Sequence, residues 1–228
     1  GLPLAFGRAF PDSIVGRYRL GPLGRGWSHW WEIGLSVESD ATVVITGMGG
    51  SQRRFQPDSR GGYFAQAGDQ ATLSRIAGGA FMLREANGLV TRFRPDAKLE
   101  SVEDTNGNRI TADYTGDLLT SLMHSSGQSL LIAYNAARRI ESITDPVGRE
   151  TAFIYDPTGE HLIEVQAYDG QVTRYTYITG SGTATEHALA FIQFPDGTYR
   201  VFTYDALGKL ASTYLDDALP GNGTSDQL

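Results

Sequence analysis

The chain has 228 residues, a mass of 24.7 kDa and no cysteine, which excludes disulfides, thiolate metal sites and a cysteine nucleophile. Its 19 basic and 26 acidic residues give a formal net charge of −7, so we expect no non-specific binding to nucleic acid or to an anionic membrane surface. No apolar run approaches the roughly 20 residues of a membrane-spanning helix, so no membrane span is expected.

Local patterns favour β structure throughout the chain. The 11 tyrosines, 10 phenylalanines and 28 glycines are typical of strands and of the turns between them. The apolar runs are short, as in Val43–Ile45, Leu130–Ile132 and Phe153–Tyr155, and no long window has the periodicity of an amphipathic helix. We therefore predict an all-β fold.

The opening segment, residues 1–48, holds all three tryptophans. Residues 1–4 lack the charged and apolar regions of a secretory signal peptide, so none is expected in this chain. Trp27, Trp30 and Trp31 lie close together and are candidates for ligand contact or for an end cap. Flat indole faces stack on sugar rings, whereas a hydrophobic plug covers an open sheet edge. The plug is the favoured interpretation.

Two glycine-containing strings that resemble ligand loops are better explained as turns. Gly47–Ser51 is not followed by a helical pattern, so it lacks the context of a phosphate-binding loop. Asp104–Asn108 has the composition of a calcium loop, but its glycine comes too early. We predict a hairpin turn at each.

A repeat runs through residues 106–217. Five glycines recur at intervals of 20 to 27 residues, and a tyrosine follows seven residues after each. The glycines are Gly107, Gly127, Gly148, Gly170 and Gly197, and the tyrosines are Tyr114, Tyr134, Tyr155, Tyr177 and Tyr204. Asp156 and Asp205 directly follow their tyrosines, and Gly159 and Gly208 come three residues later. This regularity defines a repeated structural unit.

Each unit is predicted to be a β-hairpin. In the third unit, residues 149–155 form the outgoing strand, residues 156–159 a turn with proline at its second position, and residues 161–167 the return strand. The fifth and seventh positions after each glycine share a face, which is aromatic in nearly every unit and is expected to be dry, whereas the opposite face is mixed. An isolated hairpin is marginal, so we expect tandem antiparallel hairpins to stack into one curved, spiral sheet.

These residues resemble a known family. The unit Gly148–Gly159 is similar to the Tyr-Asp (YD) repeats of Rhs proteins, which also occur in teneurins and in the C component of insecticidal toxin complexes. Asp104–Ile110 resembles the first well-formed repeat of many Rhs chains, and residues 2–10 and 21–29 resemble the segment that opens an Rhs region. Thr115 and Ile178 depart from the pattern, because aspartate is expected there.

The resemblance divides the chain into four parts. They are the opening segment with its tryptophan-rich cap (1–48), degenerate early hairpins (49–105), YD-type repeats (106–217) and a tail or linker (218–228). The chain resembles the N-terminal part of the repeat region, which in such families belongs to a hollow shell around a toxic domain.

The resemblance implies a structural, non-enzymatic role in a shell that encapsulates or displays a cargo such as a C-terminal toxin. It implies a bacterial protein, secreted or at the cell surface, exported as part of a larger protein. The expected partners are the remaining repeats or the cargo, with self-association through free strand edges. The alternative is a carbohydrate- or cell-surface-binding module that uses exposed aromatic residues. No cofactor is expected.

No catalytic or metal site is predicted. The histidines, His29, His124, His161 and His187, fall in different units, and a metal site or a general base requires such groups to converge with a carboxylate. The fourth unit is longer than its neighbours. Its extra residues, 179–187, are expected to form a mobile surface hairpin tip.

Overall fold

The computed structural model describes residues 1–219, so residues 220–228 of the predicted tail or linker lie outside the described part. One short α-helix, α1, spans Ile14–Arg17, and two 3-10 helices, η1 and η2, span Met48–Gly50 and Ala77–Gly79. The strands are β1 (Arg8–Ala9), β2 (Leu20–Gly21), β3 (Gly24–Arg25), β4 (Ser28–His29), β5 (Gly34–Val37), β6 (Val43–Thr46), β7 (Gln52–Pro57), β8 (Tyr63–Ala65), β9 (Thr72–Arg75), β10 (Phe81–Arg84), β11 (Val90–Phe93), β12 (Leu99–Glu103), β13 (Arg109–Thr115), β14 (Leu118–His124), β15 (Ser129–Tyr134), β16 (Ile140–Thr144), β17 (Glu150–Tyr155), β18 (Leu162–Gln166), β19 (Val172–Tyr177), β20 (Leu189–Gln193), β21 (Tyr199–Tyr204) and β22 (Leu210–Asp216).

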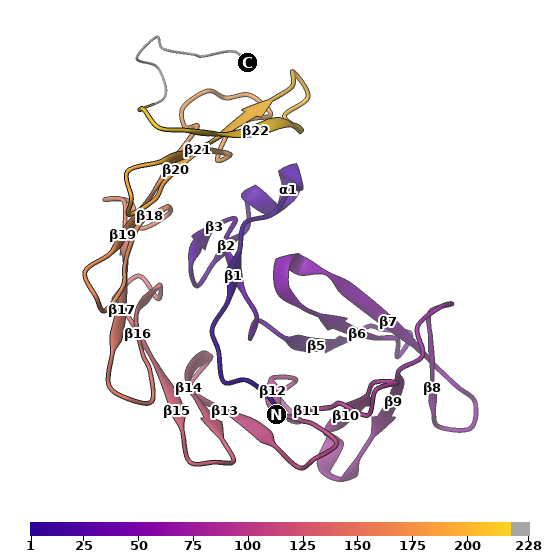
Figure 1. Ribbon diagram of the computed structural model, residues 1–228. Coiled ribbons are helices and arrows are strands. Elements are labelled where there is room, and N and C mark those ends of the chain that lie inside the picture. Colours follow the sequence, from indigo (N-terminus) through magenta and orange to yellow (C-terminus); the bar gives the residue numbers. More distant parts are fainter. Residues whose placement is uncertain (220–228) are drawn as a thin grey trace. The chain divides into compact units, whose positions relative to one another are not determined.

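Within the two larger sheets, strands that follow one another in the chain pair with one another. Fourteen of them, β9 to β22, form one sheet in sequence order, and β5 to β8 form a four-stranded sheet (Figure 1). Two-stranded sheets join β1 to β4 and β2 to β3. The predicted all-β fold of tandem antiparallel hairpins in one sheet is confirmed.

The chain divides into two compact units, each built from two separate stretches. Unit 1 comprises Gly1–Arg8 and His29–Ile132, and unit 2 comprises Ala9–Ser28 and the chain from Ala133 onward. The four-part division predicted from the sequence describes the character of successive stretches and stays a prediction.

The core of unit 1 lies between two sets of strands. Phe55 of β7 and Phe93 of β11 are fully buried there, among apolar side chains from β5, β6, β9 and β10. Strand β6 is built of β-branched residues, which suit a pleated surface. Gly47–Ser51 forms the turn between β6 and β7, where the Gly47 N–H donates to the Ser51 carbonyl at 2.9 Å.

The glycines of the repeat occupy the turns between strands. Each has a positive φ, from 82° at Gly107 to 89° at Gly197, a conformation that glycine adopts without steric cost. The members of this set are Gly107, Gly127, Gly148, Gly170 and Gly197.

The aspartate after the tyrosine closes the next turn. The Gly159 N–H donates to the Asp156 carbonyl at 2.9 Å, while Asp156 Oδ1 accepts the N–H groups of Glu160 (2.9 Å) and His161 (3.1 Å). Asp205 likewise accepts two N–H groups of its own turn. A carboxylate that bonds its own following backbone replaces the turn bonds that water would otherwise make.

Four of the five repeat tyrosines directly follow a register shift near the end of their strand. Ile154 pairs with Glu164, but Tyr155 pairs with Leu162, so the return strand carries one extra residue as a β-bulge. The same shift occurs at Tyr114, Tyr177 and Tyr204.

The tyrosine hydroxyls bond the preceding strand. Tyr155, Tyr177 and Tyr204 donate to carbonyl oxygens 15 residues earlier, on Ile140, Leu162 and Leu189, at 2.7 to 2.8 Å. Each acceptor is the first residue of its strand. The tyrosine therefore ties the end of one strand to the start of the strand before it.

The predicted separation of a dry and a mixed face is wrong in the fifth unit. By strand parity Phe202 belongs to the dry face and Val201 to the mixed one, yet Val201 is buried and Phe202 only partly buried. The reason is packing on the other face, where Tyr199 is buried edge-on against Phe191 with ring centroids 5.7 Å apart.

Candidate functional site

Residues 9–28, called the strap below, lie against the C-terminal repeats within unit 2. The strap contains α1, β2 and β3, and Figure 1 draws it in indigo beside the orange strands. Its Leu23 is fully buried, and the Pro22 carbonyl accepts the Ile140 N–H at 2.8 Å. A segment far away in sequence therefore covers the strand starts that the repeat tyrosines bond.

Two repeat tyrosines contact the strap through their hydroxyls. The Tyr155 hydroxyl lies 3.4 Å from the Pro22 carbonyl oxygen, and Trp27 Nε1 donates to the Tyr177 hydroxyl at 2.7 Å. Trp27 is 5% exposed and also packs edge-on against Tyr175, with ring centroids 4.9 Å apart. The aromatic face of the fourth repeat is thus covered by the strap.

A third repeat tyrosine contacts a buried arginine of the strap. The Arg17 guanidinium lies 4.6 Å from the centre of the Tyr204 ring, and its Nη1 donates to the Gly208 carbonyl at 2.9 Å. Arg17 is 1% exposed, and its Nε has no hydrogen-bond partner among the described residues. The ring face and the carbonyl supply the negative potential around this cation.

An ion pair fixes the strap to the Asp156–His161 turn. Arg25 Nε and Nη2 donate to the two carboxylate oxygens of Glu160 at 2.6 and 3.0 Å, and the Arg25 N–H donates to the Glu160 carbonyl at 2.7 Å. The hydrogen bond from Arg25 holds the pKa of Glu160 below its usual range. This two-point geometry is the most directional pairing available to a carboxylate.

Burial keeps the Tyr177 phenol neutral. Burial raises its pKa far above the usual value, so the hydroxyl keeps its proton to donate to Leu162 while it accepts from Trp27.

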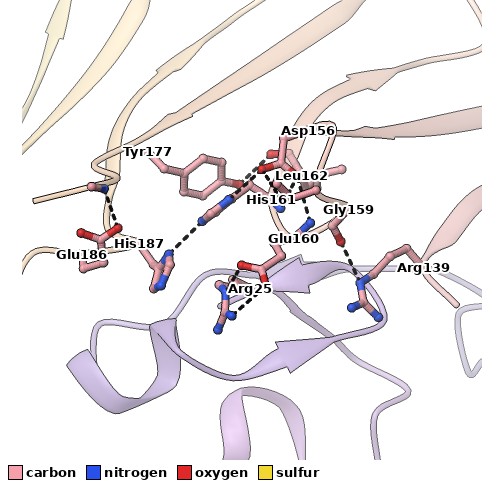
Figure 2. Close-up of polar contacts among 12 residues, drawn as sticks. Arg25, Arg139, Asp156, Gly159, Glu160, His161, Leu162, Tyr177, Glu186 and His187 are labelled. Atoms are coloured by element: carbon pink, nitrogen blue, oxygen red, sulfur yellow. Dashed lines mark hydrogen bonds and ion pairs between the residues drawn. The ribbon is translucent and has the colours of Figure 1, made fainter. Parts of the chain in front are cut away.

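Two histidines meet beside this turn (Figure 2). His161 Nδ1 lies 3.1 Å from Asp156 Oδ2, and His161 Nε2 lies 3.0 Å from His187 Nδ1. His161 is 7% exposed, and His187 is partly buried. Asp156, His161 and His187 therefore form a continuous hydrogen-bonded chain from the turn to the loop that ends at His187.

The loop before His187 is organised by one carboxylate. Glu186 accepts the N–H groups of Gly180, Ser181 and Gly182 at 2.8 to 3.0 Å, and also the Ser181 hydroxyl. These bonds, led by the one from Gly180, lower the pKa of Glu186 to about 2. The segment predicted as a mobile tip is thus closed around its own glutamate.

The prediction that the histidines stay apart is wrong for two of the four. His161 and His187 are 26 residues apart in sequence, and the longer fourth unit folds its loop back onto the third. His29 stacks on Phe6 and His124 bonds Ser126, both within unit 1. Only the contact between His161 and Asp156 could have been predicted from the sequence, because both residues belong to the same turn. Nothing in the spacing of His187 predicts that its loop ends beside His161.

The three tryptophans do not share one environment. Trp27 is buried in unit 2, whereas Trp30 and Trp31 belong to unit 1. Trp31 Nε1 donates to the Ala5 carbonyl at 2.8 Å, and Trp30 is 50% exposed with its ring packed on Gly7. The role of ligand contact or end cap stays a prediction for these residues.

The histidine chain can hold and move a proton. Within residues 1–219 no group of three or more histidine, aspartate or glutamate side chains is placed to hold a metal ion. The helices of the same residues are too short to cross a membrane. The geometry at His161 and His187 is that of two imidazoles sharing one hydrogen bond, with a carboxylate at one end.

Comparison with known proteins finds a match to the opening part of the chain. A family model described as a domain of unknown function, DUF6531, matches residues 1–55. The match confirms, over these residues, the resemblance to an Rhs/YD-type region that was predicted from the sequence. No curated protein matches the chain.

Solved structures with a similar chain path include two Tc toxin complexes. TcdB2-TccC3-TEV aligns with 14% identity and a TM-score of 0.44, and the alignment covers 80% of this chain and 11% of that one. The Tc holotoxin pore of Photorhabdus luminescens aligns with 12% identity and a TM-score of 0.43, at the same coverage. A porin-like protein from Bacteroides uniformis aligns with 13% identity and a TM-score of 0.37, over 80% of this chain and 91% of that one. With TM-scores below 0.5, these likenesses support neither a function nor a partner.

Proposed function

We propose that this chain, which resembles the opening part of the Rhs/YD-repeat region, is a non-enzymatic wall segment of a β-shell that encapsulates or displays a cargo such as a C-terminal toxin. The observation that best supports this proposal is that every hairpin from β9 to β22 joins the next one edge to edge. A sheet built this way grows by adding hairpins, as in other repeat proteins whose units contact only their neighbours. In this proposal the protein is bacterial and is secreted or displayed as part of a larger one.

The outer edge of β22 is where the proposal places further repeats of the same shell. Among residues 1–219, β22 pairs only with β21. Its Leu210, Tyr214 and Leu215 are 41%, 49% and 64% exposed. An edge with free backbone groups and apolar side chains is a template for another strand. In a solution that contains only this chain, we expect a second copy of the chain to pair with the edge of β22.

Light scattering across a concentration series tests this edge. We expect masses that rise above the 24.7 kDa of one chain as concentration increases, and we expect Leu215→Lys to restore the monomer, because an edge lysine opposes strand addition. The matched control is Leu131→Lys, an exposed leucine (53%) on the interior strand β15, which should associate like the parent. A monomer at every concentration contradicts the proposal, as does equal suppression by both variants.

The alternative function, glycan binding, depends on Trp30. A half-exposed indole offers a flat face to a sugar ring, while the buried Trp27 offers none. Binding of the intact chain to immobilised glycans, lost in Trp30→Ala while the melting temperature is retained, supports this alternative. Absence of binding by the parent chain removes it.

A further inference from the structure

We propose that His161 and His187 form a pH-sensitive clasp that holds the 179–187 loop against the Asp156–His161 turn and against Tyr18 of the strap, and that mild acid releases the loop and loosens the strap at that contact. The inference concerns unit 2 alone and does not depend on what a shell would enclose. Figure 2 shows the three elements meeting at the histidine pair.

The pair connects the Asp156–His161 turn to the loop that ends at His187. His161 begins the return path after its turn, and His187 ends the loop of the following repeat, so their 3.0 Å bond joins two successive repeats. The strap reaches the same place through Tyr18, whose ring lies edge-on to His187 with centroids 5.1 Å apart. Loss of this one bond therefore affects all three elements.

The pair accepts one additional proton but not two. Asp156 favours a proton on His161 Nδ1. The 3.0 Å bond needs one donor and one acceptor, so His161 Nε2 and His187 Nδ1 cannot both carry hydrogens. When both rings are protonated, two N–H groups and two positive charges face each other. The closed clasp excludes that state.

The charged and titratable groups around the pair come from every element packed on it. His161 faces Asp156 of its own turn, the Tyr177 ring at 4.8 Å and His187. His187 faces Arg25 and Tyr18 of the strap, and the carboxylates of Glu160 and Glu186 also act on it. Through Arg25, the strap thus places a permanent positive charge near His187, the last residue of the loop.

The direction of the pH effect follows from His187. Burial lowers its pKa, the positive charges of Arg25 and His161 lower it further, and Glu186 and Glu160 oppose them less strongly. The closed form therefore binds its proton more weakly than an open form, in which a histidine titrates near pH 6.5. Stability from the clasp is complete above about pH 6.5 and is lost progressively as the pH falls below it.

The backbone at His187 favours release. His187 has a φ of 63°, a left-handed conformation that is uncommon for residues other than glycine. Its N–H donates to the Ile178 carbonyl at 2.8 Å, which holds the loop closed at its base. The bond to His161 offsets the energy of this strained conformation. Once that bond is lost, relief of the strain favours the open loop.

Hydrogen exchange of the intact chain at pH 7.5 and pH 5.5, with exchange times corrected for intrinsic rates, tests the clasp. We expect peptides that cover residues 18–27 and 179–188 to lose protection at the lower pH, by up to the roughly tenfold that one histidine titrating near pH 6.5 in the open form can supply at pH 5.5, while β21 keeps its protection. The test variant is His187→Asn, because asparagine tolerates the left-handed conformation and does not titrate. It should abolish the pH dependence of both peptides.

The control variant is His124→Asn, which removes a partly buried histidine that bonds Ser126 in unit 1. It should keep the pH response of the parent. Unchanged protection of the parent at pH 5.5 overturns the proposal, and so does a pH response in His187→Asn equal to that of the parent.

If His187→Asn opens the loop at both pH values, a titration of the parent chain tests the clasp instead. In an NMR titration the His187 ring should titrate below pH 6.5, and the amides of the strap should follow with the same midpoint. Titration of His187 at or above pH 6.5, or strap amides that do not follow it, overturns the clasp.

Discussion

The Tyr177 hydroxyl makes two hydrogen bonds with different structural roles. Its hydroxyl donates to the Leu162 carbonyl of the preceding strand and accepts from Trp27 of the strap. The first bond belongs to the repeat, since Tyr155 and Tyr204 make it too. The second bond belongs to the place where the strap passes.

Tyr177→Phe is expected to lower the free energy of unfolding by about 1–3 kcal/mol, because it removes the hydrogen bonds that the Tyr177 hydroxyl makes with a buried indole N–H and with a strand carbonyl. Chemical denaturation followed by circular dichroism measures this loss. Tyr168→Phe is the control, since Tyr168 is 58% exposed, and it should change stability by less than about 0.5 kcal/mol. Equal effects of the two variants contradict the role assigned to the Tyr177 hydroxyl.

Arg138 occupies a turn position that glycine fills in other repeats. It has a φ of 61°, and its N–H donates to the Asn135 carbonyl as the Gly159 N–H does to Asp156. Arg138→Gly should stabilise the protein by about 0.5–1 kcal/mol by removing left-handed strain. Gly148→Ala, with a φ of 85° and open space around a new Cβ, should destabilise it by about 1–2 kcal/mol. Thermal melts check both signs, and a destabilised Arg138→Gly variant contradicts the argument.

At the level of elements, the strap determines whether the aromatic face of the repeats in unit 2 is buried. It contributes no strand to the 14-stranded sheet, yet it supplies Leu23, Trp27 and Arg17 to the buried part of unit 2. Repeat hairpins alone would leave their aromatic face to water. The strap removes that face from solvent and fixes its own position through the Arg25–Glu160 ion pair.

Trp27→Ala should lower the free energy of unfolding by about 3–5 kcal/mol, the usual cost of truncating a buried tryptophan. Amide exchange of the strap should accelerate with it. Leu20→Ala is the matched control, because Leu20 lies in the same strap but is 41% exposed; its effect should stay below about 1 kcal/mol. A Trp27→Ala variant as stable as Leu20→Ala would show that the strap does not depend on this side chain.

Net charge acts at the scale of the whole molecule. With a formal charge of −7, copies of the chain repel one another at low salt, and this repulsion opposes association through the edge of β22. Raising the salt from about 20 to about 300 mM shortens the screening length to less than about 10 Å. We expect association to strengthen over this range, as sedimentation velocity would measure. Association that weakens with salt would instead indicate contacts between opposite charges.

The repeat, and therefore the hairpins, can be predicted from local features of the sequence. A glycine with positive φ, a tyrosine seven residues later and an aspartate that bonds its own turn act over short distances, so their spacing predicts the strand order without knowledge of the rest of the chain. The turns at Gly47–Ser51 and Asp104–Asn108 follow from the same local chemistry.

What covers the hairpins could not be predicted from the sequence, because it depends on contacts between distant segments. The passage of residues 9–28 over Tyr155, Tyr177 and Tyr204 joins segments more than 130 residues apart, and no periodicity encodes such a contact. The meeting of His161 with His187 depends on how the 179–187 loop closes around Glu186. Local turn chemistry is written in neighbouring residues, whereas burial and proton sharing are set by partners that the fold brings from elsewhere in the chain.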